Sequence, residues 1–337
     1  MPTTYNNALP PLLSETGVYS DTVSRTPSGG LIPYSLNSQL WSDGAVKSCY
    51  LAVPNNGGVI TPDEQIRLHP TNSWTFPAGT VFVKNFDLTV DETKPTFPRR
   101  RLETQILVRD TNGSVYGVTY KWRADNSDAD LLANGLSEDI IVTNETGIRT
   151  QTWTYLSPAD CLTCHTPMAG YVLGVNTRQL NGNFTYPATG VIDNQIRTLN
   201  RLGLFSPAIN EAIIANLPKL SALTNSGASV EERARSYLDA NCAQCHRPGG
   251  IGNFDARYDT PLDKQHIVNY PASFSLGYSN ACIIMPKDFL RSVIQDRMNT
   301  NTMTIKMPPL GRNVIDTNAV NLIRDWINSL PTASSSP

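Results

Sequence analysis

The sequence lacks an apolar run long enough to cross a membrane, and it carries little charge of either sign. A spanning helix needs about 20 consecutive apolar residues, and no run of about 18 occurs in the 337-residue chain. Charged residues make up 17% of the chain, with 27 basic and 29 acidic side chains and a formal net charge of −2. Nucleic acids and anionic membranes attract basic surfaces. We therefore expect no nucleic-acid partner and no transmembrane segment.

Histidine is also scarce, with four residues, and cysteine occurs six times. Two of the histidines directly follow a Cys-x-x-Cys pair, in Cys161-Leu-Thr-Cys-His165 and in Cys242-Ala-Gln-Cys-His246. Zinc sites and thioredoxin-like pairs use Cys-x-x-Cys without requiring the next histidine, whereas Cys-x-x-Cys-His is typical of haem attachment. The two sulfurs form thioethers to the haem vinyl groups, and the histidine binds the iron. We therefore predict two covalently bound haem c groups, held by Cys161, Cys164 and His165 and by Cys242, Cys245 and His246.

Covalent haem attachment in bacteria takes place outside the cytoplasm, so we expect an exported protein, periplasmic or extracellular at the cell surface. The start, Met1-Pro-Thr-Thr-Tyr, lacks a basic segment followed by an apolar one. We interpret the chain as a mature form whose signal peptide is missing. In an oxidising compartment, the two remaining cysteines most often pair. A Cys49–Cys282 disulfide is therefore predicted, with two buried free thiols as the alternative.

The region before the first haem motif has the pattern of strands. The segment 80–90 is rich in β-branched and aromatic residues, with Phe82, Phe86, Leu88 and Val90 on one alternating face. The turn Asp110-Thr-Asn-Gly113 lies between two apolar runs and predicts a hairpin. A second hairpin is expected around Asn144-Glu-Thr-Gly147. We predict an antiparallel sandwich or small barrel of about 120 residues.

After Cys161 the apolar period becomes helical. One helix is expected around 192–199 and ends near Gly203, and another is expected from Ser206 through Leu217. Ser229 and Glu232 form a capping box before a helix that leads to the second haem motif. Asp316 or Thr317 caps a final helix that Pro331 ends.

This last region resembles a single-haem class I cytochrome c in its order of helix, haem motif, methionine loop and terminal helix. The loop reads Lys306-Met-Pro-Pro-Leu310. The resemblance implies that His246 is the proximal iron ligand and Met307 the distal one, with Met303 as the nearby competitor. A His/Met pair raises the reduction potential relative to a His/His pair.

The distal ligand of the first haem has several candidates in the sequence. Met168 follows His165 too closely to reach the opposite face of the haem. Two histidines remain, and we favour His69, which Pro70 follows, with His266 as the runner-up. An open coordination site, a methionine such as Met285, or a ligand from another subunit are the alternatives.

The expected fold class is α+β, with an N-terminal antiparallel β-sandwich-like domain followed by α-helical c-type haem domains, the last class I cytochrome c-like. The expected divisions are an N-terminal arm (1–34), a β-rich domain (35–158), a first haem-binding helical segment (159–226), a class I cytochrome c-like domain (227–331) and a tail (332–337).

Taken together, the chain resembles a family of bacterial diheme c-type cytochromes with a β-rich N-terminal region, sometimes found near or fused to quinoprotein dehydrogenases. Besides the haem motifs and Met307-Pro-Pro309, the resemblance is carried by Pro33-Tyr-Ser-Leu-Asn-Ser-Gln-Leu-Trp-Ser-Asp43, Trp74-Thr-Phe-Pro-Ala-Gly-Thr80 and Tyr116-Gly-Val-Thr-Tyr-Lys-Trp122. It implies electron transfer between redox protein partners, and it names no donor.

We therefore expect an electron-transfer protein and no enzyme. A bolder hypothesis is self-association into an extracellular electron-conducting filament, through the N-terminal arm and the sheet edges. A diheme peroxidase is the enzyme alternative, but its two motifs lie in similar helical domains, whereas about 160 largely β-like residues precede Cys161 here. The third hypothesis is an electron-accepting subunit of a dehydrogenase.

Overall fold

A computed structural model describes residues 1–5, 8–94, 96 and 98–332, and these form two compact units. Unit 1 comprises Met1–Leu36 and Gly44–Lys219, and unit 2 comprises Asn37–Asp43 and Leu220–Pro337. The first haem motif therefore belongs to the same unit as the β-rich region, although a separate segment 159–226 was expected. Apart from residue 332, the expected tail 332–337 lies outside the described residues.

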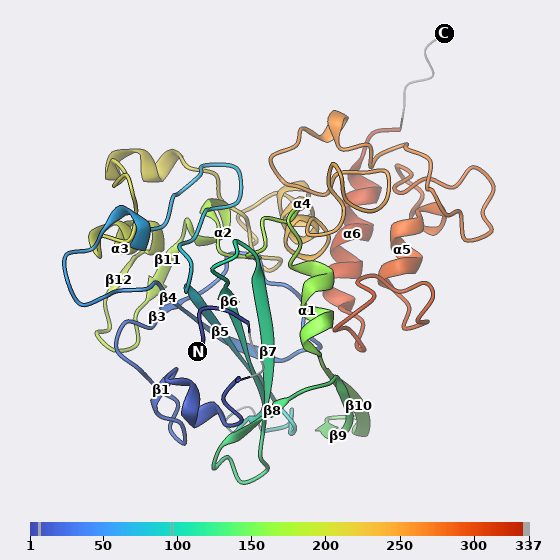
Figure 1. The fold of residues 1–337 in the computed structure, drawn as a ribbon. Helices are drawn as coiled ribbons and strands as arrows, with labels where there is room; N and C mark the ends of the chain where they lie inside the picture. The colour runs from blue at the N-terminus through green and yellow to red at the C-terminus, as the bar shows by residue number, and fades with distance from the viewer. Residues whose placement is uncertain (6–7, 95, 97, 333–337) are drawn as a thin grey trace. The chain divides into compact units, whose positions relative to one another are not determined.

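Unit 1 contains all twelve strands of the described structure and three of its α-helices, which are short (Figure 1). The strands are β1 (Tyr19–Asp21), β2 (Thr26–Pro27), β3 (Ile32–Tyr34), β4 (Val46–Ala52), β5 (Val81–Leu88), β6 (Arg100–Arg109), β7 (Val115–Trp122), β8 (Ala129–Leu132), β9 (Leu136–Asn144), β10 (Gly147–Tyr155), β11 (Asn183–Thr185) and β12 (Ile192–Asn194). The helices are α1 (Pro158–Cys164), α2 (Thr177–Leu180) and α3 (Gln195–Arg201), with 3-10 helices at Leu13–Thr16, Pro62–Glu64 and Glu211–Asn216.

The centre of unit 1 is one antiparallel sheet of six strands in the order β3-β4-β5-β6-β7-β8. Each strand pairs with the next one along the chain, through connections that range from the tight turn between β6 and β7 to the long segment 53–80 between β4 and β5. The predicted hairpin between β6 and β7 is confirmed, and Gly113 has the positive φ of +86° that its turn requires. The second predicted hairpin is confirmed as β9 and β10, which pair from Gly147 opposite Asn144.

The expected sandwich or barrel is wrong, because helices and loops cover the sheet where a second sheet was expected. One face carries Val83, Ile106 and Val118, which pack with Leu13 and Tyr19 of the N-terminal segment. On the other face, Tyr34, Leu51 and Phe82 of the sheet pack with residues of the segment 172–214. Among these are Val172, Leu180 and Ile196. With both faces buried in this way, the sheet needs no facing partner sheet.

The N-terminal residues form part of unit 1 and are not a free arm over the positions described. The backbone of Thr3 accepts a hydrogen bond from Thr111 at 3.1 Å, and the backbone of Tyr5 donates to the Asp110 carboxylate at 2.9 Å. The α-amino group of Met1 donates to the Thr16 carbonyl at 2.9 Å. These bonds hold the first residues on the sheet.

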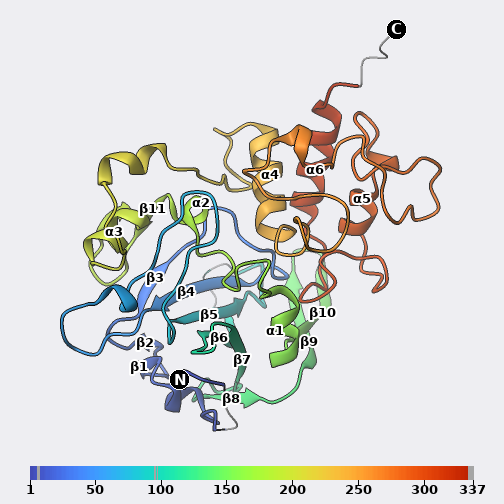
Figure 2. The same ribbon diagram turned by 45° about the horizontal axis from the view of Figure 1, so that its top comes forward.

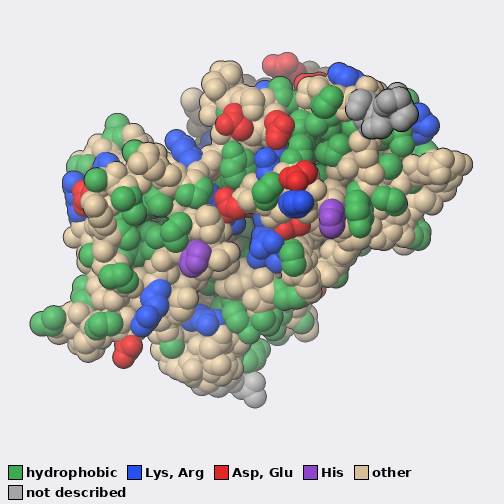
Figure 3. Space-filling view, turned by 90° about the horizontal axis from the view of Figure 1, so that it is seen from above, with side chains coloured by type: hydrophobic (Ala, Val, Ile, Leu, Met, Phe, Trp, Pro, Cys, Tyr) green, Lys and Arg blue, Asp and Glu red, His purple; other side chains and the backbone are tan. Residues whose placement is uncertain are grey.

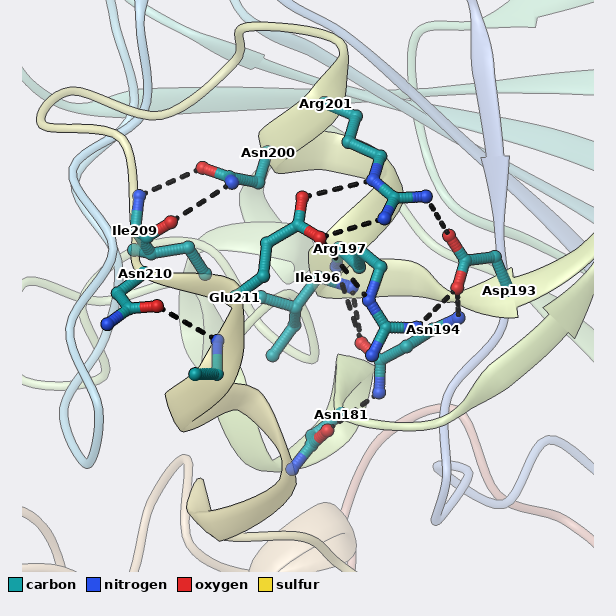
Figure 4. A network of polar contacts seen from close by, with 11 residues as sticks. Asn181, Asp193, Asn194, Ile196, Arg197, Asn200, Arg201, Ile209, Asn210 and Glu211 are labelled. Carbon is teal, nitrogen blue, oxygen red and sulfur yellow. Dashed lines mark hydrogen bonds and ion pairs between the residues drawn. The ribbon is translucent and has the colours of Figure 1, made fainter.

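Helix α3 is confirmed close to its predicted place, with Asn194 as its N-cap and Gly203 at a φ of +73° beyond its end. The predicted helix from Ser206 to Leu217 is wrong, because only a 3-10 helix forms there, and Asn210 caps it by accepting from the backbone of Ala212. Polar contacts join this 3-10 helix to α3 (Figure 4). They include the pair Arg201–Glu211 at 2.9 Å and the pair Arg197–Glu211 at 3.6 Å.

Unit 2 has three α-helices, α4 (Val230–Asn241), α5 (Val293–Met298) and α6 (Thr317–Ser329), and 3-10 helices at Leu262–Lys264 and Phe289–Arg291. The predicted caps of α4 and α6 are confirmed, since Ser229 and Glu232 form a capping box and Asp316 accepts from the backbone of Ala319. Helices α4 and α6 lie side by side around the unit's core (Figures 1 and 2), in which Trp326 is fully buried.

The prediction of α-helical haem domains, the last of them class I cytochrome c-like, is wrong. The described fold is rich in strands, with several antiparallel sheets and few helices. Over the described part of 159–226 and 227–331, loops make up most of the chain. The reason lies in residues with positive φ, which helices exclude. In unit 2 they include Gly249, Gly252, His266, Asn269, Leu276, Gly277, Asn280, Lys287 and Gly311. None of the helices in the described ranges is long and apolar enough to cross a membrane.

The capping box of α4 generates a stability prediction. Ser229→Ala removes the side-chain oxygen that accepts from the backbone of Glu232 at 3.1 Å. We expect the free energy of unfolding to fall by about 1 kcal/mol, measured by urea denaturation. Ser226→Ala, at an exposed position outside the helix, is the control and should leave stability nearly unchanged. Equal stability of the two variants would contradict the capping role.

Candidate functional site

Helix α1 presents the first haem motif, and local sequence explains where the helix starts. Ser157 and Asp160 form a capping box, and Pro158 occupies the first turn, where a missing N–H costs nothing. The helix lies against β7 (Figures 1 and 2). At that contact a Cβ atom on Gly117 would be 2.8 Å from Cys161 Sγ. Glycine on β7 therefore makes the room that the Cys161 sulfur occupies.

The side chain of His165 is half-buried, and one short contact holds its imidazole. Its Nδ1 lies 2.6 Å from the carbonyl oxygen of Tyr171. Burial, and after it the charge of Lys84, lower the pKa of His165 to about 4, although the Tyr171 carbonyl acts in the opposite direction. The ring is therefore neutral at pH 7. A neutral ring that donates from Nδ1 to a carbonyl keeps the lone pair of Nε2, which is the electron pair that binds a metal.

His165 and Cys161 line a cavity on the face of the six-stranded sheet that packs with the segment 172–214. The other lining residues are Tyr34, Phe82, Lys84, Gln105, Ile106, Leu107, Gly117, Val118, Val172 and Leu173. Sequence reasoning missed Tyr34 and Lys84. A signal for Lys84 was present, because it interrupts the apolar alternating face of β5 between Phe82 and Phe86.

The cysteines of the two motifs are poor candidates for redox-active thiols. Burial is the first cause that raises the pKa of Cys161 to about 11, and burial likewise raises the pKa of Cys242 to about 12. Reactive Cys-x-x-Cys pairs need a lowered thiol pKa, because the thiolate is the nucleophile. Over the described ranges, no three His, Cys, Asp or Glu side chains converge as ligands of one metal ion. The raised pKa values of Cys161 and Cys242 therefore disfavour thiol–disulfide exchange.

The second motif lies in unit 2, where α4 ends at Asn241 and Cys242 is its C-cap. The ring of His246 stacks on Phe254 with centroids 4.3 Å apart. Its Nδ1 is buried without a hydrogen-bond partner, and a Cβ atom on Gly252 would be 2.8 Å from it. Burial lowers the pKa of His246, the Ile251 backbone opposes this, and the charge of Arg297 adds to it. This imidazole is thus also kept neutral.

Met307 and Met303 have different surroundings. Met303 is 67% exposed, whereas Met307 is half-buried. The backbone N–H of Met307 donates to the carbonyl of Arg297 at 2.8 Å, and the guanidinium of Arg297 is the group whose charge acts on His246. Of the two methionines, Met307 is therefore the one tied to the surroundings of the His246 imidazole.

The described lining of the cavity at His165 does not include His69 or His266. His69 lies in an exposed loop of unit 1, and its Nδ1 accepts from the backbone of Asn72 at 2.9 Å. Its carbonyl accepts from Thr177, which ties the loop to α2. His266 belongs to unit 2, where its ring stacks on Tyr270 at 4.6 Å. Neither assignment as a distal ligand is decided by these positions, and both stay predictions.

Cys49 and Cys282 are both reduced in the structure. Cys49 is buried on β4 in unit 1, and burial raises the pKa of its thiol. Cys282 belongs to unit 2 and is half-buried. A disulfide between them stays a prediction.

Comparison with known protein families, with curated proteins and with solved structures found no match for this chain. On the face shown in Figure 3, acidic and basic side chains lie interspersed, without a patch of one sign. The functional interpretation therefore depends on the two motifs and on the groups that surround them.

The contact between Gly117 and Cys161 generates a second prediction. Gly117→Ala places a Cβ atom 2.8 Å from Cys161 Sγ and 2.9 Å from its Cβ. Helix α1 must move, and we expect the free energy of unfolding to fall by about 1–3 kcal/mol. Gly29→Ala is the control, because no atom lies within 4 Å of that added Cβ. If the two variants have the same urea midpoint, α1 does not rest on Gly117 in solution.

Proposed function

We propose that this protein is an electron carrier with two covalently attached haem c groups, one at each Cys-x-x-Cys-His motif. Each bound haem supplies a one-electron iron couple. The chain's own residues attach the groups, set the imidazole orientation and exclude water. The proposal extends to an exported protein that works between redox partners outside the cytoplasm, as covalent haem attachment requires.

The observation that carries the proposal is the state of His165. Its Nδ1 is engaged with the Tyr171 carbonyl at 2.6 Å, so Nε2 is the nitrogen left for iron. Its lowered pKa keeps protons from competing for that nitrogen at neutral pH. Cys161, four residues earlier, lines the same cavity as His165. The imidazole and the sulfur that a haem would need are therefore side by side.

The raised pKa values of Cys161 and Cys242 also suit attachment. In thioether formation, the S–H bond adds across a vinyl double bond: sulfur bonds to one carbon and hydrogen to the other. No atom leaves and no electron is gained or lost overall. The thiols must therefore arrive reduced, and a thiol with a raised pKa resists oxidation.

The first test counts haems. Protein matured in a cell with cytochrome c assembly machinery should have the polypeptide mass plus two whole haems. The double variant Cys161→Ser/Cys164→Ser should retain one haem, and so should Cys242→Ser/Cys245→Ser. The control Cys49→Ser/Cys282→Ser should keep both, since neither residue belongs to a motif. Colourless wild-type protein at the mass of the bare polypeptide would contradict the proposal.

The second test concerns the distal ligand at His246. Met307→Leu should remove the far-red charge-transfer band of a sulfur–iron bond and make that haem high-spin, because leucine has no donor atom. Met303→Leu, at a side chain 67% exposed, should leave the spectrum unchanged. Absorption and magnetic circular dichroism spectra measure both variants. Loss of the band in Met303→Leu alone would transfer the ligand role to Met303.

A further inference from the structure

The face of the six-stranded sheet that packs with the segment 172–214 has a cross-strand row of polar residues at the cavity beside His165. The register pairs Tyr34 with Cys49, Cys49 with Lys84, and Lys84 with Gln105. Residues paired in this way point to the same side of a sheet. Tyr34, Lys84 and Gln105 line the cavity together with His165 and Cys161. The row therefore brings a phenol and an ammonium group to the place where the first haem is proposed.

The hydroxyl of Tyr34 indicates a binding site for a hydrogen-bond acceptor. The side chain is 4% exposed, and its Oη is buried without a hydrogen-bond partner. Burial is the first cause that raises the pKa of Tyr34, followed by the Cys49 thiol opposite it in the register, but that thiol does not meet the geometry of a hydrogen bond to Oη. A buried hydroxyl without a partner costs about 1–3 kcal/mol. A ligand with an acceptor atom in the cavity would remove that cost.

Two lysines, Lys47 and Lys84, lie on this face of the sheet. Among the described residues, no carboxylate forms an ion pair with Lys84. Lys47 lies on the same face of β4, and burial followed by the charge of Lys84 lowers its pKa to about 8. Glu103 is the acid on this face, but burial raises its pKa to about 8, so it is largely uncharged at pH 7. The face therefore favours an anion.

We propose that Tyr34 and Lys84 bind a carboxylate, a propionate of the haem attached at Cys161 and Cys164. This inference rests on the proposed function. Gly117, which contacts Cys161, lies on β7, two strands from Lys84 on β5 and four strands from Tyr34 on β3. Neighbouring strands are about 4.8 Å apart, so Lys84 lies roughly 10 Å across the sheet from the thioether end. The propionates leave a porphyrin from the edge opposite its thioether carbons.

The test uses the full two-haem chain with Lys84→Gln and Tyr34→Phe. A positive charge beside the haem stabilises the reduced iron, so Lys84→Gln should lower the potential of the first haem. We expect about a tenfold change in its Fe(III)/Fe(II) ratio at fixed potential, equal to ~59 mV for a one-electron couple. Tyr34→Phe should shift it less and in the same direction. In both variants the propionate bending bands in the resonance Raman spectrum should move, while the iron stays low-spin.

The matched control is Lys121→Gln. Lys121 lies on the same sheet but already pairs with Glu138 at 3.2 Å, so its loss should leave the propionate bands in place. The reduction potential of the first haem is assigned to the redox transition that is missing from the titration of Cys161→Ser/Cys164→Ser. A change of spin state in Lys84→Gln would make Lys84 an iron ligand and overturn the inference. An unmoved potential with unmoved propionate bands would also overturn it.

A free anion is the other source of a carboxylate, and sodium acetate at constant ionic strength is the probe. If acetate shifts the wild-type potential and the shift vanishes in Lys84→Gln, a free anion occupies the site and the inference fails. A potential insensitive to acetate supports the propionate. Failure of the proposed function looks different, because the mass of the wild-type protein would then show no haem at Cys161 and Cys164.

Discussion

The interaction on which the rest depends is the hydrogen bond between His165 Nδ1 and the Tyr171 carbonyl. It fixes which ring nitrogen carries the proton, and burial then keeps the other nitrogen unprotonated. A polar ring nitrogen held away from water needs a hydrogen-bond partner, and here the backbone carbonyl oxygen is that partner. Gly117 provides room for the neighbouring sulfur. Remove the Tyr171 contact, and the ring loses its tautomer and orientation; the motif would then be an ordinary pair of thiols beside a mobile histidine.

The sequence predicted those features that depend on neighbours along the chain. Both hairpins follow from Asn-Gly and Thr-Gly turns, and the caps at Ser229 and Asp316 depend on residues at most three positions away. The covering of the sheet depends on contacts across more than 100 residues, such as Tyr5 with Asp110. Periodicity cannot report these contacts. The helical domains were overestimated because apolar spacing in short segments resembles a helix even where positive-φ residues interrupt it.

The two motifs share a sequence pattern but differ in what surrounds the imidazole. His165 donates to a carbonyl, which increases the electron density of the ring. His246 instead stacks on Phe254, with Nδ1 unpartnered and Arg297 nearby. Under the proposed function, the Tyr171 carbonyl favours the oxidised iron at the first site and the charge of Lys84 opposes it, whereas the Arg297 cation favours the reduced iron at the second site. Under that function, neighbouring groups that the motif itself does not encode would set the two potentials.

The segment Asn37–Asp43 has a consequence for how the chain is made. It is coded near the start, yet it belongs to unit 2, where the Asp43 carboxylate accepts from the backbone of Asn313 at 2.9 Å across 270 positions and Trp41 donates to the Val314 carbonyl at 2.8 Å. A ribosome releases this segment long before its partners emerge. Unit 2 therefore completes its folding only at the end of synthesis, and a gene fragment beginning at residue 220 would encode a unit missing one of its own parts.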